Sequence, residues 1–188
     1  MTENNENVDL MSKINSILET DGNINKFRDT HGDTLLHLAV KEENESAVEV
    51  LLGMGIDATL RNAQRRTALN LALEGELERL VDRLMEKGVR LDSSDILLLL
   101  SKNKLQFFEK LLDKGLDVDY QPDRDDKSFL HVAVQKNCTS AVEMLLTRGA
   151  NVNILTQTGH SPLHLVATPE ILELLLTREP DLNHRTKF

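Results

Sequence analysis

The sequence predicts an all-α protein in which short helical hairpins repeat and stack on one another. Gly22, Gly55 and Gly88 recur every 33 residues, and an apolar segment such as SAVEVLLGMG precedes the glycine. Self-similarity at a fixed period indicates a repeat architecture, in which each unit buries its apolar faces against its neighbours. Four related stretches, in two pairs each 33 residues apart, carry the prediction: DTLLHLAV (Asp33–Val40), RTALNLAL (Arg66–Leu73), KSFLHVAV (Lys127–Val134) and HSPLHLVA (His160–Ala167).

Each part of the repeated stretch has a physical role in a short helix. Its hydroxyl residue can cap the free N–H groups of a helix start, and Pro162 stands where a missing N–H costs nothing. Apolar residues follow at the 3.6-residue period of a buried helix face, and small alanines such as Ala39 and Ala72 allow helices to approach closely. The later glycine ends the second helix, because glycine adopts a left-handed backbone without penalty.

This unit resembles the ankyrin repeat, whose motif Thr-Pro-Leu-His-x-Ala is followed by two helices and a β-turn finger. The resemblance covers the chain from about Val8 to Phe188 and implies a single ankyrin-repeat domain over 8–188 after a disordered segment, 1–7. An amphipathic helix, Val8–Glu19, is expected in an N-terminal cap over 8–28. The resemblance places repeats at about 29–61, 62–92, 93–121, 122–155 and 156–188.

The third repeat departs from this pattern. Gly88 and Gly115 are separated by 27 residues, six fewer than the period, and the missing residues fall before Ser94, where the finger is expected. Aligned from Gly115, Ser94 takes the capping position, and Leu97 and Leu99 replace the histidine and alanine of the motif. We expect a repeat without a finger and a local shift in helix packing. The gap is either tolerated drift in loop length or a notch between Arg66 and Lys127 that admits a partner.

The fifth repeat is also irregular. TPEILELLLTRE leaves about three residues fewer between its helices than the other repeats have, and Glu179 replaces the usual glycine. The third and fifth repeats are therefore predicted to be the least stable parts of the domain.

The composition disfavours several classes of function. A net charge of −9 disfavours sequence-independent binding of DNA or RNA, which requires clustered cations. No apolar run approaches the ~20 residues that span a bilayer, since Ile96–Leu100 has five, so we expect no membrane insertion. The N-terminal residues lack a secretory signal. The single cysteine, Cys138, cannot form an internal disulfide and fits a reducing compartment. We therefore expect the protein in the cytoplasm or nucleus.

No catalytic, cofactor or metal site is predicted. His37, His131 and His164 occur once per repeat, whereas zinc ligands cluster at short spacings. The ankyrin resemblance implies that these histidines bond within the turn that leads into the helix, and Asn70 takes the same position in the second repeat. Gly53-Met54-Gly55 follows a helix rather than a strand, so it indicates a helix end and not a nucleotide loop. We expect no cofactor and no small-molecule substrate.

The resemblance implies that another protein is bound on the concave side, which the finger tips and first helices form. Arg61, Arg65 and Arg66 are the densest basic cluster, either a solvated finger or an anchor for an acidic partner motif. The predicted partner-binding residues are His31, Asp33, Lys41, Gln64, Arg65, Arg66, Arg124, Asp125, Lys127, Lys136, Gln157 and His160.

The expected function is that of a non-enzymatic protein–protein interaction module: an adaptor, scaffold or inhibitor. A second class stays open, in which these residues are the N-terminal targeting or regulatory part of a larger enzyme, ubiquitin-ligase subunit or channel whose active part lies beyond Phe188. The final residues, DLNHRTKF, match the start of a finger and then halt, which favours a longer protein. Whether the coding sequence continues distinguishes the two.

Overall fold

The structure is a computed structural model that describes residues 10–20, 22–101, 104–122 and 126–186. These residues form helices and loops, with no strand among them. The helices are α1 (Leu10–Thr20), α2 (Leu35–Lys41), α3 (Glu45–Gly53), α4 (Ala68–Glu74), α5 (Glu78–Glu86), α6 (Ser93–Leu99), α7 (Leu105–Asp113), α8 (Phe129–Gln135), α9 (Thr139–Thr147), the 3-10 helix η1 (Pro162–Leu165) and α10 (Pro169–Leu176).

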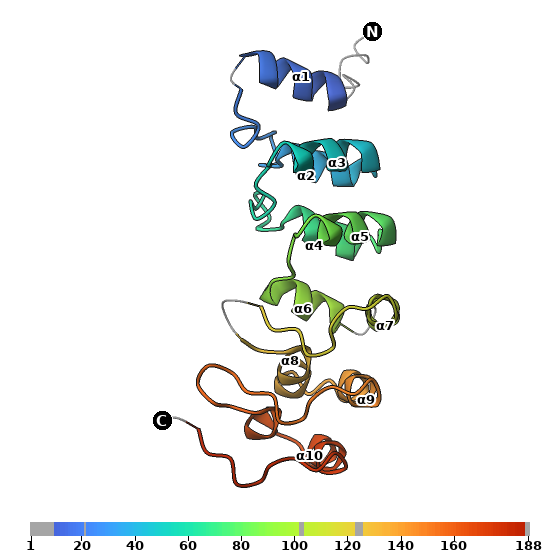
Figure 1. Ribbon diagram of the computed structural model, residues 1–188, viewed down its shortest axis with the longest axis vertical. Helices are drawn as coiled ribbons and strands as arrows, with labels where there is room; N and C mark the ends of the chain where they lie inside the picture. The colour runs from blue at the N-terminus through green and yellow to red at the C-terminus, as the bar shows by residue number, and fades with distance from the viewer. Residues whose placement is uncertain (1–9, 21, 102–103, 123–125, 187–188) are drawn as a thin grey trace. The chain divides into compact units, whose positions relative to one another are not determined.

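The chain divides into two compact units, Met1–Arg90 and Leu91–Phe188. Helices α1 to α5 belong to the N-terminal unit, and α6 to α10 with η1 belong to the C-terminal unit (Figure 1). The division falls in the connection between α5 and α6, where the sequence predicts a missing finger. The single domain over 8–188 and its five repeat boundaries stay predictions.

The N-terminal unit is a stack of helical hairpins with an aliphatic core. Helix α2 packs against α1, α3 and α4, and α5 packs against α3 and α4. The predicted N-terminal amphipathic helix is present as α1, with Leu10 and Ile14 buried against the stack. Ala39 and Ala72 are fully buried at the helix contacts, as their small size predicts. Further core residues are Leu35, Leu36, Val48, Leu51, Leu69, Val81 and Leu84.

The C-terminal unit has larger side chains in its core. Helix α8 packs against α6, α9 and η1, and α9 packs against α10. The rings of Phe108 and Phe129 lie 4.6 Å apart between centroids and are fully buried. Tyr120 lies 6.3 Å from Phe129, and its hydroxyl donates a hydrogen bond to the carbonyl of Leu91 (2.9 Å). Aromatic packing therefore fills the region around the third and fourth repeats.

Fingers are the loops that lead into the first helix of each repeat. We number them by repeat: finger 1 (residues 22–34), finger 2 (55–67), finger 4 (115–128) and finger 5 (149–161). Fingers 1 and 2 lie on one side of their helices (Figure 1). The connection from α3 to α4 holds 14 residues, 54–67, whereas that from α5 to α6 holds six, 87–92. The prediction that the third repeat lacks its finger is confirmed.

The start of α6 corrects one prediction. Asp92, not Ser94, is its N-cap: the Asp92 carboxylate accepts hydrogen bonds from the N–H groups of Ser94 (2.7 Å) and Asp95 (3.1 Å). Asp95 completes the reciprocal cap by accepting from the N–H of Asp92 (2.7 Å). Leu99 is fully buried like Ala39, as the alignment predicts. Leu97, aligned with the buried His37, is instead 45% exposed.

The fifth repeat contains a shortened first helix. Four residues form the 3-10 turn η1 after the N-cap Ser161, with Pro162 at its first position. Glu179 adopts a left-handed backbone (φ 53°) at the end of the repeat, where Gly149 (φ 84°) ends the fourth. The sequence prediction that Glu179 stands in a glycine position is therefore confirmed.

Candidate partner-binding surface

A reciprocal cap opens the first helix of every repeat. In the first repeat, Thr34 Oγ1 accepts a hydrogen bond from the N–H of His37, and His37 Nδ1 accepts from the N–H of Thr34 (3.3 Å). In the second repeat, Asn70 Oδ1 accepts from the N–H of Thr67 (3.0 Å), so the amide performs the same function. Ser128 with His131 and Ser161 with His164 repeat the arrangement. The predicted structural role of these residues is confirmed.

Two of these histidines also tie one finger to the next. His37 Nε2 lies 2.7 Å from the carbonyl oxygen of Arg66, and His131 Nε2 lies 3.0 Å from that of His160. A carbonyl can only accept, so Nε2 carries the proton and Nδ1 is the acceptor in the cap. Burial lowers the pKa of both imidazoles, although the hydrogen bonds to the carbonyls of Arg66 and His160 act in the opposite direction. Both rings therefore act in the neutral form and link one finger to the next by hydrogen bonds.

Short polar side chains form a second tie between successive fingers. Asn25 Oδ1 accepts from the N–H of Asp57 (2.8 Å), and Asp119 Oδ1 accepts from the N–H of Asn151 (2.8 Å). The repeated motif did not predict this ladder. A pattern in the sequence could have, because Asn or Asp follows the glycine within four residues in GNIN, GID, GLDVD and GANVN. The third repeat, GVRLD, has Asp92 at the position of Asp119, and the Asp92 carboxylate caps α6.

A buried carboxylate joins fingers 1 and 2. Asp33 is fully buried, accepts from Asn62 Nδ2 (2.7 Å) and forms an ion pair with Lys41. The Asp29 carboxylate accepts from the N–H groups of His31 and Asp33, each at 2.8 Å. Burial acts to raise the pKa of Asp29, but these hydrogen bonds outweigh it and the pKa is lowered. The two fingers are thus held in one fixed arrangement.

The prediction that Asp33 contacts a partner is contradicted by this burial. A side chain with no exposed surface cannot touch another protein, so Asp33 acts by positioning Lys41 and Asn62. Lys41 itself remains 46% exposed and stays a candidate contact. The sequence did not reveal the difference, because Asp33 precedes the cap Thr34 just as Arg66, which is 39% exposed, precedes the cap Thr67.

Finger 2 presents three arginines that differ in environment. Arg61 donates to the carbonyl oxygen of Arg65 (2.8 Å), and Arg66 forms an ion pair with Glu74 of α4. Arg65 is exposed and has a left-handed backbone (φ 63°). Gln64 is also exposed. The N-terminal unit therefore brings Lys41, Gln64, Arg65 and Arg66 together with the exposed His31 on fingers 1 and 2 and α2.

The C-terminal unit carries a separate group of predicted contacts. Lys127 Nζ donates to Gln135 Oε1 of α8 (2.9 Å), while Lys136 and Gln157 are exposed. His160 is partly buried, and its Nδ1 lies 2.8 Å from the hydroxyl oxygen of Thr158. Arg124 and Asp125 lie outside the described residues.

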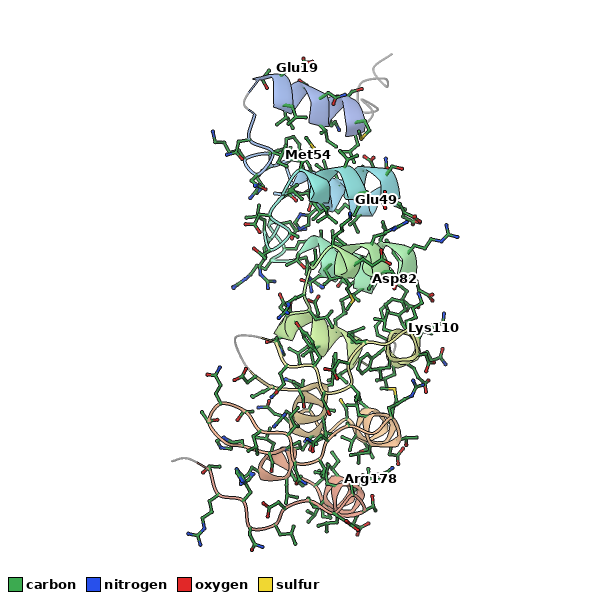
Figure 2. The ribbon with its side chains drawn as sticks, in the orientation of Figure 1. Glu19, Glu49, Met54, Asp82, Lys110 and Arg178 are labelled. Atoms are coloured by element: carbon green, nitrogen blue, oxygen red, sulfur yellow. The ribbon has the colours of Figure 1, made fainter. Side chains whose placement is uncertain are left out.

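The outer side of each unit, made by the second helices, is linked by ion pairs. Arg83 of α5 lies 3.3 Å from Glu49 of α3, and Arg148 lies 3.0 Å from Glu109 of α7. Figure 2 labels Glu49 and Asp82 on α3 and α5. These exposed pairs contribute little individually and make the outer face a charge-balanced surface.

The described residues offer neither a metal site nor a membrane span. They contain no group of three or more His, Cys, Asp or Glu side chains that could hold a metal ion. Within the same residues, no helix has the length and apolarity needed to cross a bilayer. Cys138 is a free thiol at the N-cap of α9.

These features define a repeat protein of stacked helical hairpins with finger loops and capped first helices. The chain belongs to the ankyrin-repeat family: the family profile "Ankyrin repeats (3 copies)" matches residues 3–95 and again 97–186. Ankyrin repeats are protein–protein interaction modules. The resemblance noted from the motif residues is confirmed.

Relatives are larger proteins that share this region. The chain is 29% identical over 153 residues to the B-cell lymphoma 3 protein homolog of Mus musculus, covering 79% of this chain and 28% of that protein. It is 30% identical over 155 residues to the nuclear factor NF-kappa-B p105 subunit of Gallus gallus, covering 77% of this chain and 16% of that protein. The chain thus spans less than a third of the length of these relatives.

Solved structures show the same fold. The crystal structure of the ankyrin repeat domain of Bcl-3 matches with a TM-score of 0.62 and 24% identity, covering 95% of this chain and 85% of that one. A second match, TM-score 0.52 and 19% identity, is to a structure of the Bdellovibrio bacteriovorus endopeptidase Bd0816 in complex with the immunity protein Bd3460, covering 91% of this chain and 93% of the matched chain. At these identities the likeness establishes the fold.

Proposed function

We propose that this protein is a non-enzymatic interaction module that binds a partner protein through its fingers and first helices, as an adaptor, scaffold or inhibitor. The observation that carries the proposal is a contrast within the N-terminal unit. Buried caps and ties fix the finger backbones, through contacts such as His37 with Arg66 and Asp33 with Asn62. On that fixed frame, polar side chains such as Gln64 and Arg65 remain exposed. A rigid backbone with exposed, varied side chains suits specific recognition, because little conformational entropy is lost on binding.

Affinity capture with the intact chain tests the proposal. The test variant carries Gln64→Glu and Lys136→Glu, which change one exposed residue in each unit on the proposed surface. The control variant carries Lys87→Glu and Arg178→Glu, which change exposed residues at the ends of α5 and α10 (Figure 2 labels Arg178). We expect proteins captured by the natural chain to be lost from the test variant and kept by the control, with equal melting temperatures for both. Retention of every captured protein by the test variant overturns the assignment of the surface.

A second candidate function places this region within a larger protein whose activity lies beyond Phe188. The lengths of the relatives support it, since the matched region is 28% and 16% of two of them. The interaction surface then targets or regulates the remaining part. A transcript that continues past the codon for Phe188 supports this candidate, and a stop codon there contradicts it.

We place the protein in the cytoplasm or nucleus. The support is its single cysteine, Cys138, present as a free thiol, which suits a reducing compartment. Imaging of the tagged protein tests this, and accumulation in the secretory pathway contradicts it.

A further inference from the structure

Arg65 occupies a left-handed backbone position that glycine holds in two of the other fingers. Its φ is 63°, and the equivalent residues are Gly32 (φ 74°) in finger 1, Asp126 (φ 45°) in finger 4 and Gly159 (φ 79°) in finger 5. Glycine adopts this backbone freely and aspartate tolerates it, whereas it is rare for a long side chain such as arginine. A residue that breaks a local rule at an exposed loop tip points to a role outside folding.

Finger 1 shows why residue 32 must be glycine and why residue 65 need not be. A Cβ on Gly32 would lie 2.9 Å from the backbone nitrogen of Ala63, which donates to the carbonyl oxygen of His31 (3.1 Å). Finger 1 therefore needs glycine because finger 2 crosses it closely. The six-residue connection 87–92 supplies no third finger that could cross Arg65 in the same way. The lost finger thus permits a side chain at residue 65.

Finger 2 has a net charge of +2, since it holds three arginines and Asp57, whereas the unit that carries it is net negative. Residues 58–66 contain Arg61, Arg65 and Arg66 and no acidic residue, whereas residues 1–90 carry 17 acids and 11 bases, a net charge of −6. The Glu74 carboxylate pairs with Arg66. No acidic side chain of the described residues forms an ion pair with Arg65. An exposed guanidinium is therefore presented at the tip of the finger.

The backbone of finger 2 holds its two outermost arginines in place. Arg61 donates to the carbonyl oxygen of Arg65 (2.8 Å), which ties one guanidinium to the residue that carries the other. Asn62 Oδ1 accepts from the N–H groups of Gln64 and Arg66, each at 3.0 Å, and closes the turn between them. Two planar cations on a fixed turn match carboxylates, which arginine binds through two parallel hydrogen bonds.

We propose that finger 2 is the docking point for an acidic segment of the partner protein, with Arg65 as the main anchor and Arg61 beside it. This inference rests on the proposed interaction function and specifies the chemistry of the partner. The acidic surroundings of the unit repel a long polyanion, so the finger favours a short carboxylate-rich segment that contacts its tip alone. A nucleic acid is disfavoured, because a phosphate backbone would be repelled by a chain of net charge −9 with one basic finger.

Fluorescence anisotropy with the full chain tests the proposal. The probes are a short labelled peptide of alternating Glu and Asp with Gly and Ser spacers, its Gln/Asn counterpart, and single-stranded DNA and RNA of equal length. We expect the acidic peptide to bind, and Arg65→Ala and Arg61→Ala each to weaken its binding about tenfold, whereas Arg178→Ala, an exposed arginine of the other unit, changes it less than about twofold. Binding should weaken as salt rises from about 0.05 to 0.3 M.

Arg65→Gly separates a binding role from a folding role. Glycine fits the backbone of residue 65, so this variant should melt at about 2–4 °C above Arg65→Ala while losing peptide binding to the same extent. Three results overturn the proposal: no binding of the acidic peptide, binding that Arg65→Ala leaves unchanged, and tighter binding of an oligonucleotide through the same arginines.

The capture experiment distinguishes failure here from failure of the proposed function. If the Gln64→Glu, Lys136→Glu variant loses captured proteins while Arg65→Ala loses none, the interaction function stands and the docking assignment falls. If neither variant loses a captured protein, the interaction function and the docking assignment are both contradicted.

Discussion

At the residue scale, the histidines of the first and fourth repeats use both ring nitrogens as structural groups. His37 accepts from the N–H of Thr34 through Nδ1 and donates to the carbonyl oxygen of Arg66 through Nε2. His131 makes the same two contacts with Ser128 and His160. Each histidine therefore needs a single proton, because a second one on Nδ1 would face the N–H that this nitrogen accepts from. The finger ties depend on the neutral form of the ring.

These contacts predict that acidity weakens the fold. Burial lowers the pKa of His37 and His131 below the ordinary value of 6.5, so the unfolded chain binds protons more tightly than the folded chain. Stability from this source is complete above pH 6.5 and is lost as pH falls from there through the lowered pKa values. The urea midpoint should therefore decrease between about pH 7.5 and 5.5.

The double variant His37→Asn, His131→Asn provides the check. Asparagine makes the same cap in the second repeat, where Asn70 accepts from Thr67, so the caps should survive. Each lost Nε2 bond should lower the free energy of unfolding by about 1 kcal/mol, and the pH dependence should flatten relative to that of a variant in which the exposed His31 is replaced by Asn. An undiminished pH slope in the double variant contradicts the role assigned to the two rings.

At the element scale, α6 shows how a helix start can be misjudged from repeat alignment. Counting back from Gly115 selects Ser94 as the cap, because Ser94 precedes Gly115 by 21 positions, as Thr34 precedes Gly55. Because the third repeat has no finger, the local sequence determines where α6 begins. Asp92 and Asp95 stand three residues apart and cap each other reciprocally, so the helix begins earlier.

Substitutions at these two residues distinguish the caps. Asp92→Ala removes the acceptor of the Ser94 and Asp95 N–H groups and should lower the free energy of unfolding by about 1 kcal/mol, or the melting temperature by about 2–4 °C. Ser94→Ala removes one hydroxyl that donates to Asp92 and should cost less than half as much. Thermal melts of both variants measure the difference. A larger loss of stability for Ser94→Ala than for Asp92→Ala contradicts this assignment and identifies Ser94 as the cap.

The elements also show which parts of the fold and site were predictable. Periodic motifs predicted the capped first helices and the missing finger, because each rests on a few residues at fixed spacing. The burial of Asp33 was not predictable, since it depends on Asn62 and Lys41 meeting it from separate elements. The 3-10 turn η1 was also not foreseen: Pro162 favours any helix start, and the early Thr168 and Pro169 leave room for only one turn. The exposure of residues such as Gln64 and Lys136 followed from the repeat, but the pairing of Arg66 with Glu74 did not.

At the scale of the whole molecule, two of the repeats lack an element that the others share. The third repeat has no finger. The fifth replaces its first helix by η1 and ends on Glu179 with a left-handed backbone. In a repeat protein, stability is a sum of terms within and between neighbouring units, so a missing or shortened element lowers stability locally.

Hydrogen exchange should therefore proceed unevenly along the chain. We expect the amides of α6, α7, η1 and α10 to exchange faster than those of α2, α4 and α8, and the difference to grow in low denaturant as the weak repeats open separately. Mass spectrometry of exchanged peptides measures this for the intact chain. Glu179→Gly should slow exchange in α10, because glycine adopts the required backbone at that position without strain. Uniform exchange across all helices, unchanged by Glu179→Gly, contradicts the assignment, because repeats tied equally to their neighbours would open together.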